Sequence, residues 1–245
     1  MQLEHIKELE QIMQNESLIS LSDNDFNYKS INVLTLRPSD ISKCNSSFSK
    51  FHPMKNICDL INCNNDLKTF TAYLFYYKPF INNPTEESYF SEGEYHAPYF
   101  QNAADYYYST FVSSCYEKLY NFWDRIGDAL AYYFNVDIKE NEVNFGNVID
   151  RLHKRKDVFE NEYFRKLLDF RSLEFAEFNS KRRDIVHYYQ YQTEFFFEHS
   201  ANISDKGKIE SMWTLKNQMA QYFSQHLRSS CEGYYNTYRL INMLS

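Results

Sequence analysis

Residues 105–134 read DYYYSTFVSSCYEKLYNFWDRIGDALAYYF and contain no proline. Their apolar side chains recur at intervals of three and four residues, which places them on one face of a helix. The opposite face is polar, and we expect it to be solvated unless one of its carboxylates faces a site. The segment therefore predicts one long amphipathic helix. Its apolar face comprises Tyr108, Phe111, Cys115, Leu119, Phe122, Trp123, Ile126, Leu130 and Tyr133. Its polar face comprises Ser114, Glu117, Asn121, Asp124 and Asp128.

The prolines divide the chain, since all five precede residue 99 and none follows it. Proline breaks helix interiors, so we expect long helices in the second part. The apolar spacing predicts a short helix over 145–152, a longer one from about 158 towards 187, and a last helix from about 206 to 241. At about 1.5 Å per residue, that last helix would be roughly 50 Å long and would need another long helix or a second subunit beside it. Aromatic residues alternate over 188–197 as in a strand, so there we expect a helix end that passes into an extended loop.

Residues 1–98 are predicted to form a mixed, irregular N-terminal extension of unknown role. Apolar residues at helical spacing over 3–13 predict a first amphipathic helix, and the polar segment 20–25 predicts a loop. For the apolar segment 69–80, a buried strand and a short helix both fit the pattern. The predicted fold class is therefore mainly α, with an up-down helical bundle over residues 99–245 behind this extension.

The composition argues against several classes of protein. Only 5 of the 245 residues are glycine and 5 are proline, too few for a turn-rich barrel or sandwich. The net charge of -7 argues against a general electrostatic coat for nucleic acid, although it allows a local basic patch. No apolar run is long enough for a transmembrane helix, and the first residues lack the features of a signal peptide.

The cysteines and glycines bear on compartment and cofactors. The five cysteines are odd in number and irregularly spaced, so we expect a reduced, cytoplasmic protein without a structural zinc. No histidine pair has metal-ligand spacing, and no glycine-rich phosphate loop occurs. We therefore expect no metal, no cofactor and no membrane association.

The segment with the most chemical information is KRRDIVHYY, at residues 181–189. Histidine exchanges a proton near neutral pH, and arginine presents a charged planar fork that fits phosphate oxygens. His187 and an arginine therefore suffice in principle to cleave RNA without a metal: the imidazole handles a proton, and the guanidinium stabilises charge that develops on phosphorus. The structural alternative is that these cations only stabilise the C-terminus of a helix, where such residues are common.

Helix geometry distinguishes the two arginines. Arg183 and His187 are four residues apart and lie on nearly one face of a helix. Arg182 and His187 are five residues apart, or about 140° around an ideal helix. Arg182 could reach the same phosphate through its long side chain, a helix distortion or a dimer-related cleft, so the choice of arginine stays open.

The spacing Arg182-x-x-x-x-His187, with Ile185-Val186 before the histidine and helices on both sides, resembles the HEPN superfamily (higher eukaryotes and prokaryotes nucleotide-binding). The resemblance covers roughly residues 100–243. It implies a helical bundle that dimerises and brings two Arg/His pairs into one composite cleft. Many members are metal-independent endoribonucleases of toxin–antitoxin, abortive-infection or other antiviral systems, and others bind nucleotides or serve as scaffolds. Arg182 would then be the catalytic arginine and His187 the catalytic histidine.

Three neighbouring residues bear on this resemblance. The family often has Asn, Asp or His directly after its arginine, whereas this chain has Arg183 there and Asp184 one residue later. Asp184 is the candidate for the supporting polar role. Tyr189, two residues after the histidine, matches a position that a partner nucleotidyltransferase modifies in some toxins of the family.

A second basic segment precedes the motif. Phosphate contacts from such a run would make RNA binding salt-dependent, and we predict that it contacts the RNA backbone together with Lys181. The alternative is a solvated basic turn. The aromatic residues, 18% of the chain, are expected mainly in the core and a dimer interface. The basic residues of this segment are Arg151, His153, Lys154, Arg155 and Lys156.

The resemblance thus implies a homodimeric HEPN-type endoribonuclease, a toxin or antiviral-defence effector. Its substrate would be RNA, and an antitoxin or regulatory protein would be a further partner. An inactive HEPN module that binds nucleotide or protein is the first alternative. A helical scaffold, in which the Arg/His pair only caps a helix, is the second.

Overall fold

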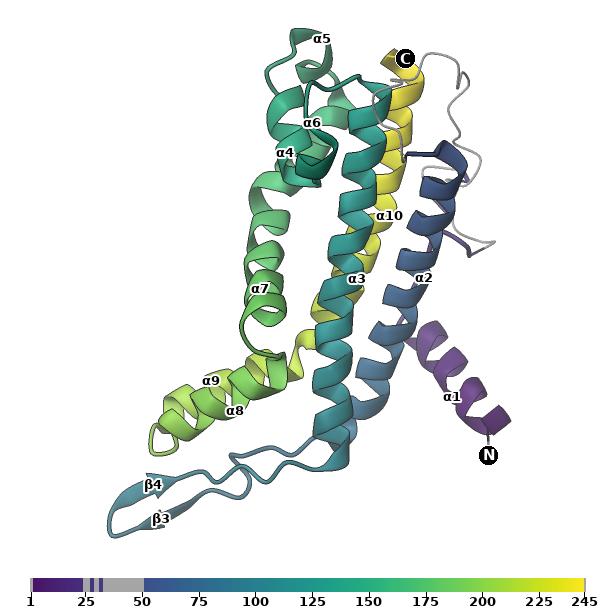
Figure 1. Ribbon diagram of the computed structural model, residues 1–245. Coiled ribbons are helices and arrows are strands. Elements are labelled where there is room, and N and C mark those ends of the chain that lie inside the picture. Colours follow the sequence, from purple (N-terminus) through teal and green to yellow (C-terminus); the bar gives the residue numbers. More distant parts are fainter. Residues whose placement is uncertain (1, 24–26, 29–30, 33–50, 245) are drawn as a thin grey trace. The chain divides into compact units, whose positions relative to one another are not determined.

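The computed structural model describes residues 2–23, 27–28, 31–32 and 51–244 (Figure 1). The chain forms two compact units. Unit 1 comprises Met1–Leu18, Lys68–Tyr116 and Arg182–Gln225, and unit 2 comprises Ile19–Leu67, Glu117–Lys181 and His226–Ser245. Within each unit, helices pack against one another as a bundle, so the predicted mainly α fold class is confirmed.

Helices account for most of the described residues, and the strands form two short antiparallel hairpins, β1–β2 and β3–β4. The helices are α1 (Gln2–Asn15), α2 (Pro53–Tyr77), α3 (Ala103–Tyr133), α4 (Phe145–Leu152), α5 (Lys156–Phe159), α6 (Glu162–Phe170), α7 (Ala176–His187), α8 (Tyr191–Ala201), α9 (Lys206–Asn217) and α10 (Met219–Leu244). The strands are β1 (Asn27–Tyr28), β2 (Ile31–Asn32), β3 (Tyr89–Ser91) and β4 (Glu94–His96). Short 3-10 segments are η2 (Lys78–Phe80) and η3 (Glu140–Glu142), and η4 (Arg171–Phe175) is π-helical.

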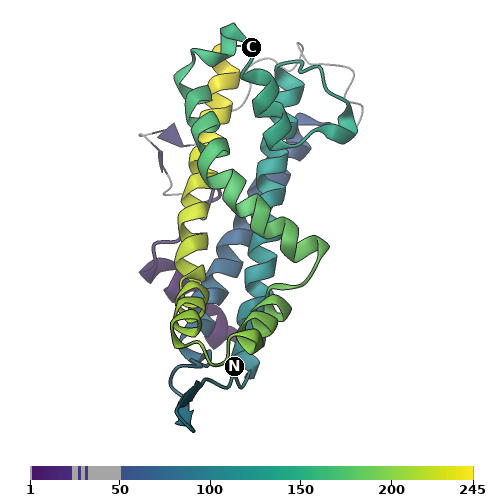
Figure 2. The ribbon, with the colours of Figure 1, turned by 90° about the vertical axis from the view of Figure 1, so that its left-hand side faces the viewer.

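Aromatic rings hold the elements of unit 1 together. Tyr73 of α2 stacks on Phe111 of α3, with ring centroids 4.5 Å apart. Tyr116 of α3 meets Phe223 of α10 edge to face at 4.9 Å. The β3–β4 hairpin, visible in Figures 1 and 2, is anchored where Ala97 donates a hydrogen bond to the Ile203 carbonyl at 3.0 Å. Much of the aromatic excess of the sequence therefore serves local packing.

Unit 2 is built around the indole of Trp123, which is wholly buried. The indole stacks on Phe170 of α6 at 3.9 Å and lies 4.8 Å from the Phe145 ring of α4. Burying a side chain that contributes 150–250 Å² is worth roughly 4–6 kcal/mol at about 25 cal/mol per Å². In the same unit, Asn64 of α2 donates to Ser230 of α10 at 2.6 Å, which links these two helices.

The predicted long helix over 105–134 is confirmed as α3, and those over 3–13 and 145–152 are confirmed as α1 and α4. The ambiguous segment 69–80 is helical, since α2 continues to Tyr77 and the 3-10 turn η2 follows. Residues 20–23 are irregular as expected, while residues 24 and 25 of the predicted loop lie outside the described residues. The helix expected from 158 to 187 begins instead at Glu162, after an Asn161 cap, and is interrupted by the π-helical η4.

The prediction of an extended loop over 188–197 is wrong, because the helix α8 begins at Tyr191. Phe195 and His199 lie one turn apart on α8 and are buried, whereas Phe196 and Phe197 are exposed. Large aromatic residues on the exposed face hide the helical period and produce the alternation that resembles a strand.

The prediction of a single last helix is also wrong, because the helix is interrupted at Gln218, between α9 and α10. The Gln218 N–H is shared between the carbonyls of Thr214 at 3.1 Å and Leu215 at 3.2 Å, which tightens the final turn of α9. Apolar residues continue at helical spacing on both sides, so the pattern carries no sign of the break. Among the described residues, no helix combines the length and the apolar character needed to cross a membrane.

Candidate functional site

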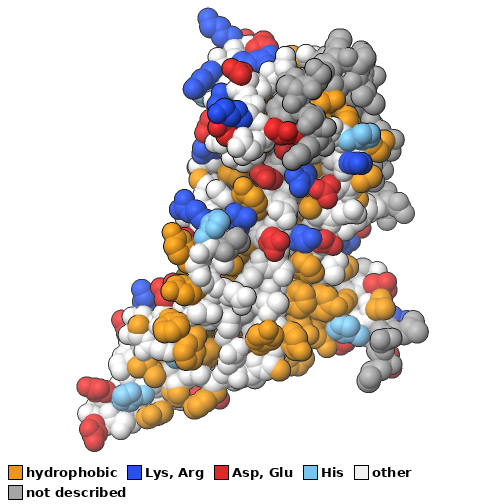
Figure 3. Space-filling view, viewed as in Figure 1, with side chains coloured by type: hydrophobic (Ala, Val, Ile, Leu, Met, Phe, Trp, Pro, Cys, Tyr) orange, Lys and Arg blue, Asp and Glu red, His pale blue; other side chains and the backbone are white. Residues whose placement is uncertain are grey.

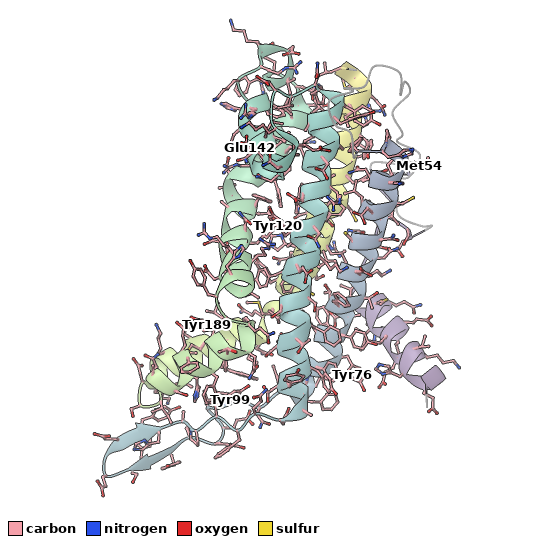
Figure 4. The ribbon with its side chains drawn as sticks, viewed as in Figure 1. Met54, Tyr76, Tyr99, Tyr120, Glu142 and Tyr189 are labelled. Atoms are coloured by element: carbon pink, nitrogen blue, oxygen red, sulfur yellow. The ribbon has the colours of Figure 1, made fainter. Side chains whose placement is uncertain are left out.

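The motif residues lie at the C-terminal end of α7. Residues 182–187 are α-helical, and His187 is the last residue of the helix. The Asp184 carbonyl accepts hydrogen bonds from the N–H groups of Tyr188 at 3.0 Å and Tyr189 at 3.3 Å, and this ends the helix. Figure 4 labels Tyr189 in the connection from α7 to α8.

The chemically important side chains at this end are accessible. His187, Arg183 and Asp184 are exposed, and Arg182 is half-buried. The exposed Tyr188 and Tyr189 follow directly. In the space-filling view of Figure 3, Lys or Arg and His side chains lie over the end of α7, and hydrophobic side chains cover much of α8. An imidazole in this position can exchange protons with a bound molecule.

The observed helix bears on the choice between the arginines. The π-helical distortion η4 ends at Phe175, before the motif, and the turn from Arg182 to His187 is ordinary α-helix. Arg183 and His187 therefore share a face, and Arg182 lies about 140° away. A local distortion of the helix, one of the ways in which Arg182 could reach the same phosphate as His187, is therefore not observed between these two residues.

Lys181 belongs to unit 2 and is engaged in a local ion pair. Its Nζ lies 2.7 Å from Glu177 Oε1, one turn earlier on α7. The Lys181 ammonium also lowers the pKa of Glu177, chiefly through this hydrogen bond. Such exposed pairs contribute about 0.3–0.5 kcal/mol, so the lysine can be released to another anion at little cost.

The predicted basic segment lies in unit 2 and serves partly as structural support. Arg155 donates to the Phe134 carbonyl at 2.6 Å and pairs with Asp157 at 2.7 Å. Arg151 donates to the Asp137 carbonyl at 2.5 Å. The remaining basic residues of the run, His153, Lys154 and Lys156, are exposed.

Unit 1 contains a buried ionic cluster whose residues are not among the site residues predicted from the sequence. Lys216 of α9 and Asp105 of α3 are both 0% exposed, and Lys216 Nζ lies 2.8 Å from Asp105 Oδ1. Lys216 also donates to the Tyr99 hydroxyl at 2.6 Å. Tyr99, labelled in Figure 4, lies between β4 and α3, and its hydroxyl donates to the same carboxylate at 2.8 Å.

The charged groups of Lys216 and Asp105 are inaccessible to solvent, and the cluster is best explained as structural. Burial lowers the pKa of Lys216, although the Asp105 carboxylate acts in the opposite direction. Burial, with the nearby Lys216 charge, also lowers the pKa of His199. The only local sign in the sequence is Asn102-x-x-Asp105 at the start of α3. There Asn102 Oδ1 accepts from the Asp105 N–H at 2.9 Å, and Asp105 Oδ2 accepts from the Asn102 N–H at 3.2 Å.

The described residues contain no group of three or more His, Cys, Asp or Glu side chains placed to hold a metal ion. The end of α7 instead carries the exposed side chains of Arg183, Asp184 and His187, and the half-buried Arg182 lies on a different face of the helix. These groups suit recognition of a phosphate and proton transfer beside it.

A family model described as Cthe2314-like HEPN matches residues 59–242, a range that includes α7 with Arg182 and His187. The matched range also includes most of α2, which lies N-terminal to the domain boundary that the sequence predicts near residue 99. That domain boundary stays a prediction. No curated protein and no solved structure matches the chain.

Proposed function

The chain belongs to the HEPN family, and from that premise we propose that it is a metal-independent endoribonuclease whose reacting groups lie at the end of α7. HEPN domains are often ribonucleases. The observation that carries the proposal is the exposed His187, at the end of a helix, with Arg183 one turn earlier and Arg182 beside it.

In the proposed reaction, the His187 imidazole accepts the proton of a ribose 2′-hydroxyl. The freed oxygen forms a bond to the adjacent phosphorus, and the bond from phosphorus to the 5′-oxygen breaks. That leaving oxygen takes a proton from an imidazolium of a second copy of the chain or from water. The products are a 2′,3′-cyclic phosphate and a 5′-hydroxyl, so atoms and charge balance without a metal.

The arginines would hold the phosphate and stabilise the negative charge that grows on its oxygens. Arg182 occupies the family position, whereas Arg183 shares the helix face of His187. In a homodimer with a composite cleft, Arg182 could act on a phosphate that His187 of the second copy attacks. The two single variants distinguish these arrangements.

The cellular role we propose is that of a toxin or antiviral-defence effector, which an antitoxin or regulatory protein would restrain. Asp184 would support the reacting groups, and Tyr189 would be the modification point. The exposed Lys154 and Lys156, with Lys181, would contribute salt-dependent contacts to the RNA backbone.

The test is cleavage of labelled RNA in EDTA by the wild type, His187→Ala, Arg182→Ala and Arg183→Ala. We expect His187→Ala to lose at least about 100-fold in rate, in line with removal of a general base. Matched controls are His52→Ala and Arg165→Ala, which remove an exposed histidine and an exposed arginine outside the motif. Cleavage that survives His187→Ala would remove the mechanism.

The alternative function is that of an inactive HEPN module that binds nucleotide or a protein partner. Two observations favour it: Arg183 stands where the family often has Asn, Asp or His, and the chain carries a net charge of -7. Expression separates the two functions. A toxic wild type with a harmless His187→Ala variant supports the nuclease, whereas equal growth supports the binding module.

A further inference from the structure

The β3–β4 hairpin of unit 1 extends past the helices α8 and α9, and it is attached to them through β4 (Figure 1). Tyr95 of β4 is buried in a cluster with Ala97 and with Ile209 of α9. The Ala97 N–H, directly after β4, donates to the Ile203 carbonyl at 3.0 Å. Within the described residues the hairpin is a sheet of two strands, so β3 has β4 on one side and an open edge on the other.

The register shows which backbone groups β3 presents at this open edge. In an antiparallel pair, the N–H and C=O groups of successive residues point alternately toward the partner strand and away from it. The Ala97 N–H points away from β3, because it bonds to Ile203, and by this alternation the backbone groups of Tyr95 do so too. Phe90 lies directly opposite Tyr95, so its own N–H and C=O point outward from β3. Phe90 is 72% exposed, and an extended chain can therefore reach these two groups.

Side-chain hydrogen bonds hold the base of the hairpin in place. Asn102, directly before α3, donates through Nδ2 to Asn82 Oδ1 at 2.9 Å, and the Asn82 N–H donates to Asp105 Oδ2 at 3.2 Å. The tip is a two-residue turn in which Glu92 and Gly93 both have positive φ, 54° and 85°, as a type I′ turn requires. An edge that is already extended and anchored loses little conformational freedom when a partner binds.

An aromatic side chain stands on each face of the open edge. Tyr89, 55% exposed, lies 5.5 Å from the His96 ring, and Phe90 lies 5.6 Å from the Tyr95 ring. Successive side chains of a strand point to opposite faces, so a strand added to β3 would meet one ring on each face. Main-chain hydrogen bonds with side-chain contacts on alternate positions are the means by which a sheet edge binds an extended peptide.

The charges beside β3 decide which extended chain fits. Residues 79–117 contain no lysine and no arginine, whereas the exposed Glu87 precedes β3 and the exposed Glu92 and Glu94 follow it. Pairing of β3 with β3 of a second copy would bring two such sets of glutamates together, and like charges on adjacent strands destabilise the pair. The phosphates of RNA would be repelled in the same way. A cationic chain is attracted instead, so charge complementarity selects a basic polypeptide.

We propose that the open edge of β3 binds an extended, Lys- or Arg-bearing segment of a partner polypeptide, which adds to the hairpin as a third strand. The segment exchanges two backbone hydrogen bonds with Phe90, and its apolar side chains contact the rings of Tyr89 and Phe90. Glu87 and Glu92 lie five positions apart at the two ends of β3, so cations at the same spacing in the segment face them. This surface does not depend on the proposed nuclease reaction.

The test is a titration of the full chain, labelled at phenylalanine amides, with the capped peptide Lys-Val-Thr-Val-Thr-Lys, followed by NMR. The Phe90 signal is identified by its loss in Phe90→Leu. We expect a saturable shift of this signal with a Kd below about 1 mM, weakened by added salt. Two matched probes are the same peptide with glutamate in place of each lysine, and the same peptide with methylated backbone nitrogens. Both should bind at least about tenfold more weakly, since one lacks the charges and the other the backbone donors.

Variants locate the binding on the hairpin. Glu87→Gln with Glu92→Gln is expected to weaken binding at least about fivefold, because the peptide loses two charge partners. The matched control is Glu194→Gln with Glu198→Gln, which removes two exposed carboxylates of α8 in the same unit and should bind as the wild type does. The glutamates of both double variants are exposed, so neither change should alter the melting temperature.

Four results would each overturn the proposal. The first is the absence of a saturable Phe90 shift up to about 10 mM peptide, the weak end of specific binding. The second is equal binding of the lysine and glutamate peptides, or of the parent and methylated peptides. The third is equal affinity of the Glu87→Gln, Glu92→Gln variant and the wild type. The fourth is a Phe90 shift that follows protein concentration without peptide, which would make a second copy the occupant.

Discussion

Replacement of Lys216 by methionine tests the account of the buried cluster in unit 1. Methionine keeps an unbranched, apolar side chain of similar length but removes the ammonium group. The Asp105 carboxylate would then stay at 0% exposure without the cation that lies 2.8 Å away. Removing one partner of a buried ion pair costs about 3–5 kcal/mol.

The contacts that remain place this variant at the lower end of that range. Asp105 still accepts from the Tyr99 hydroxyl at 2.8 Å and from the N–H groups of Asn82 and Asn102, each at 3.2 Å. We therefore expect a loss of about 3 kcal/mol. For a chain of this size, that corresponds to a melting temperature lower by about 6–12 °C.

The assay is urea denaturation followed by circular dichroism, with Lys216→Met, Asp105→Asn and the double variant compared in a double-mutant cycle. Asn at 105 keeps an acceptor without the charge, so the double variant should recover most of the loss. If Lys216→Met is as stable as the wild type, or if the two losses simply add, the cluster does not stabilise the fold as an ion pair.

Three other perturbations test the packing and electrostatics of unit 2. Gly233→Ala should lower stability by about 1–3 kcal/mol, because its Cβ would lie 2.3 Å from Trp123, and thermal denaturation measures this. Burial lowers the pKa of His226 from 6.5 to about 4, so below pH 6.5 the unfolded chain binds a proton that the folded chain excludes. Up to about 3 kcal/mol should be lost as the pH falls from 6.5 to 4, and a His226→Phe variant should show a flatter profile by urea denaturation. Burial raises the pKa of Cys63 to about 11, so in the native protein at pH 8 an alkylating reagent should label the exposed Cys58 far faster, as mass spectrometry of peptides will show.

The helices that could be predicted are those whose apolar residues follow the helical period without interruption. α3 is the clearest case, because its apolar positions, such as Tyr108, Leu119 and Trp123, are buried as their spacing predicts. The prediction failed at 191–201, where exposed aromatic residues break the expected polarity of the solvent face. It also failed at Gln218, where the apolar period continues across a break in the backbone.

The motif was visible in the sequence because its residues are close together on one helix, and the structure places their side chains at an accessible helix end. The buried cluster and the packing of Trp123 against Gly233 had no comparable signal. Lys216 and Asp105 are separated by 111 residues in the sequence. Taken by itself, each has the pattern of an ordinary charged residue on the polar face of an amphipathic helix. Gly233 likewise has no visible role until the Trp123 indole is packed against it.

The amino-acid sequence by itself determined the helical class, the position of most helices and the Arg/His motif, because backbone propensity and side-chain period act over a few neighbouring residues. Only the tertiary structure decided which charges are buried, where the last helix breaks and which glycine the Trp123 indole packs against. Those features depend on desolvation and close packing between segments distant in the chain, and no local pattern specifies such pairings.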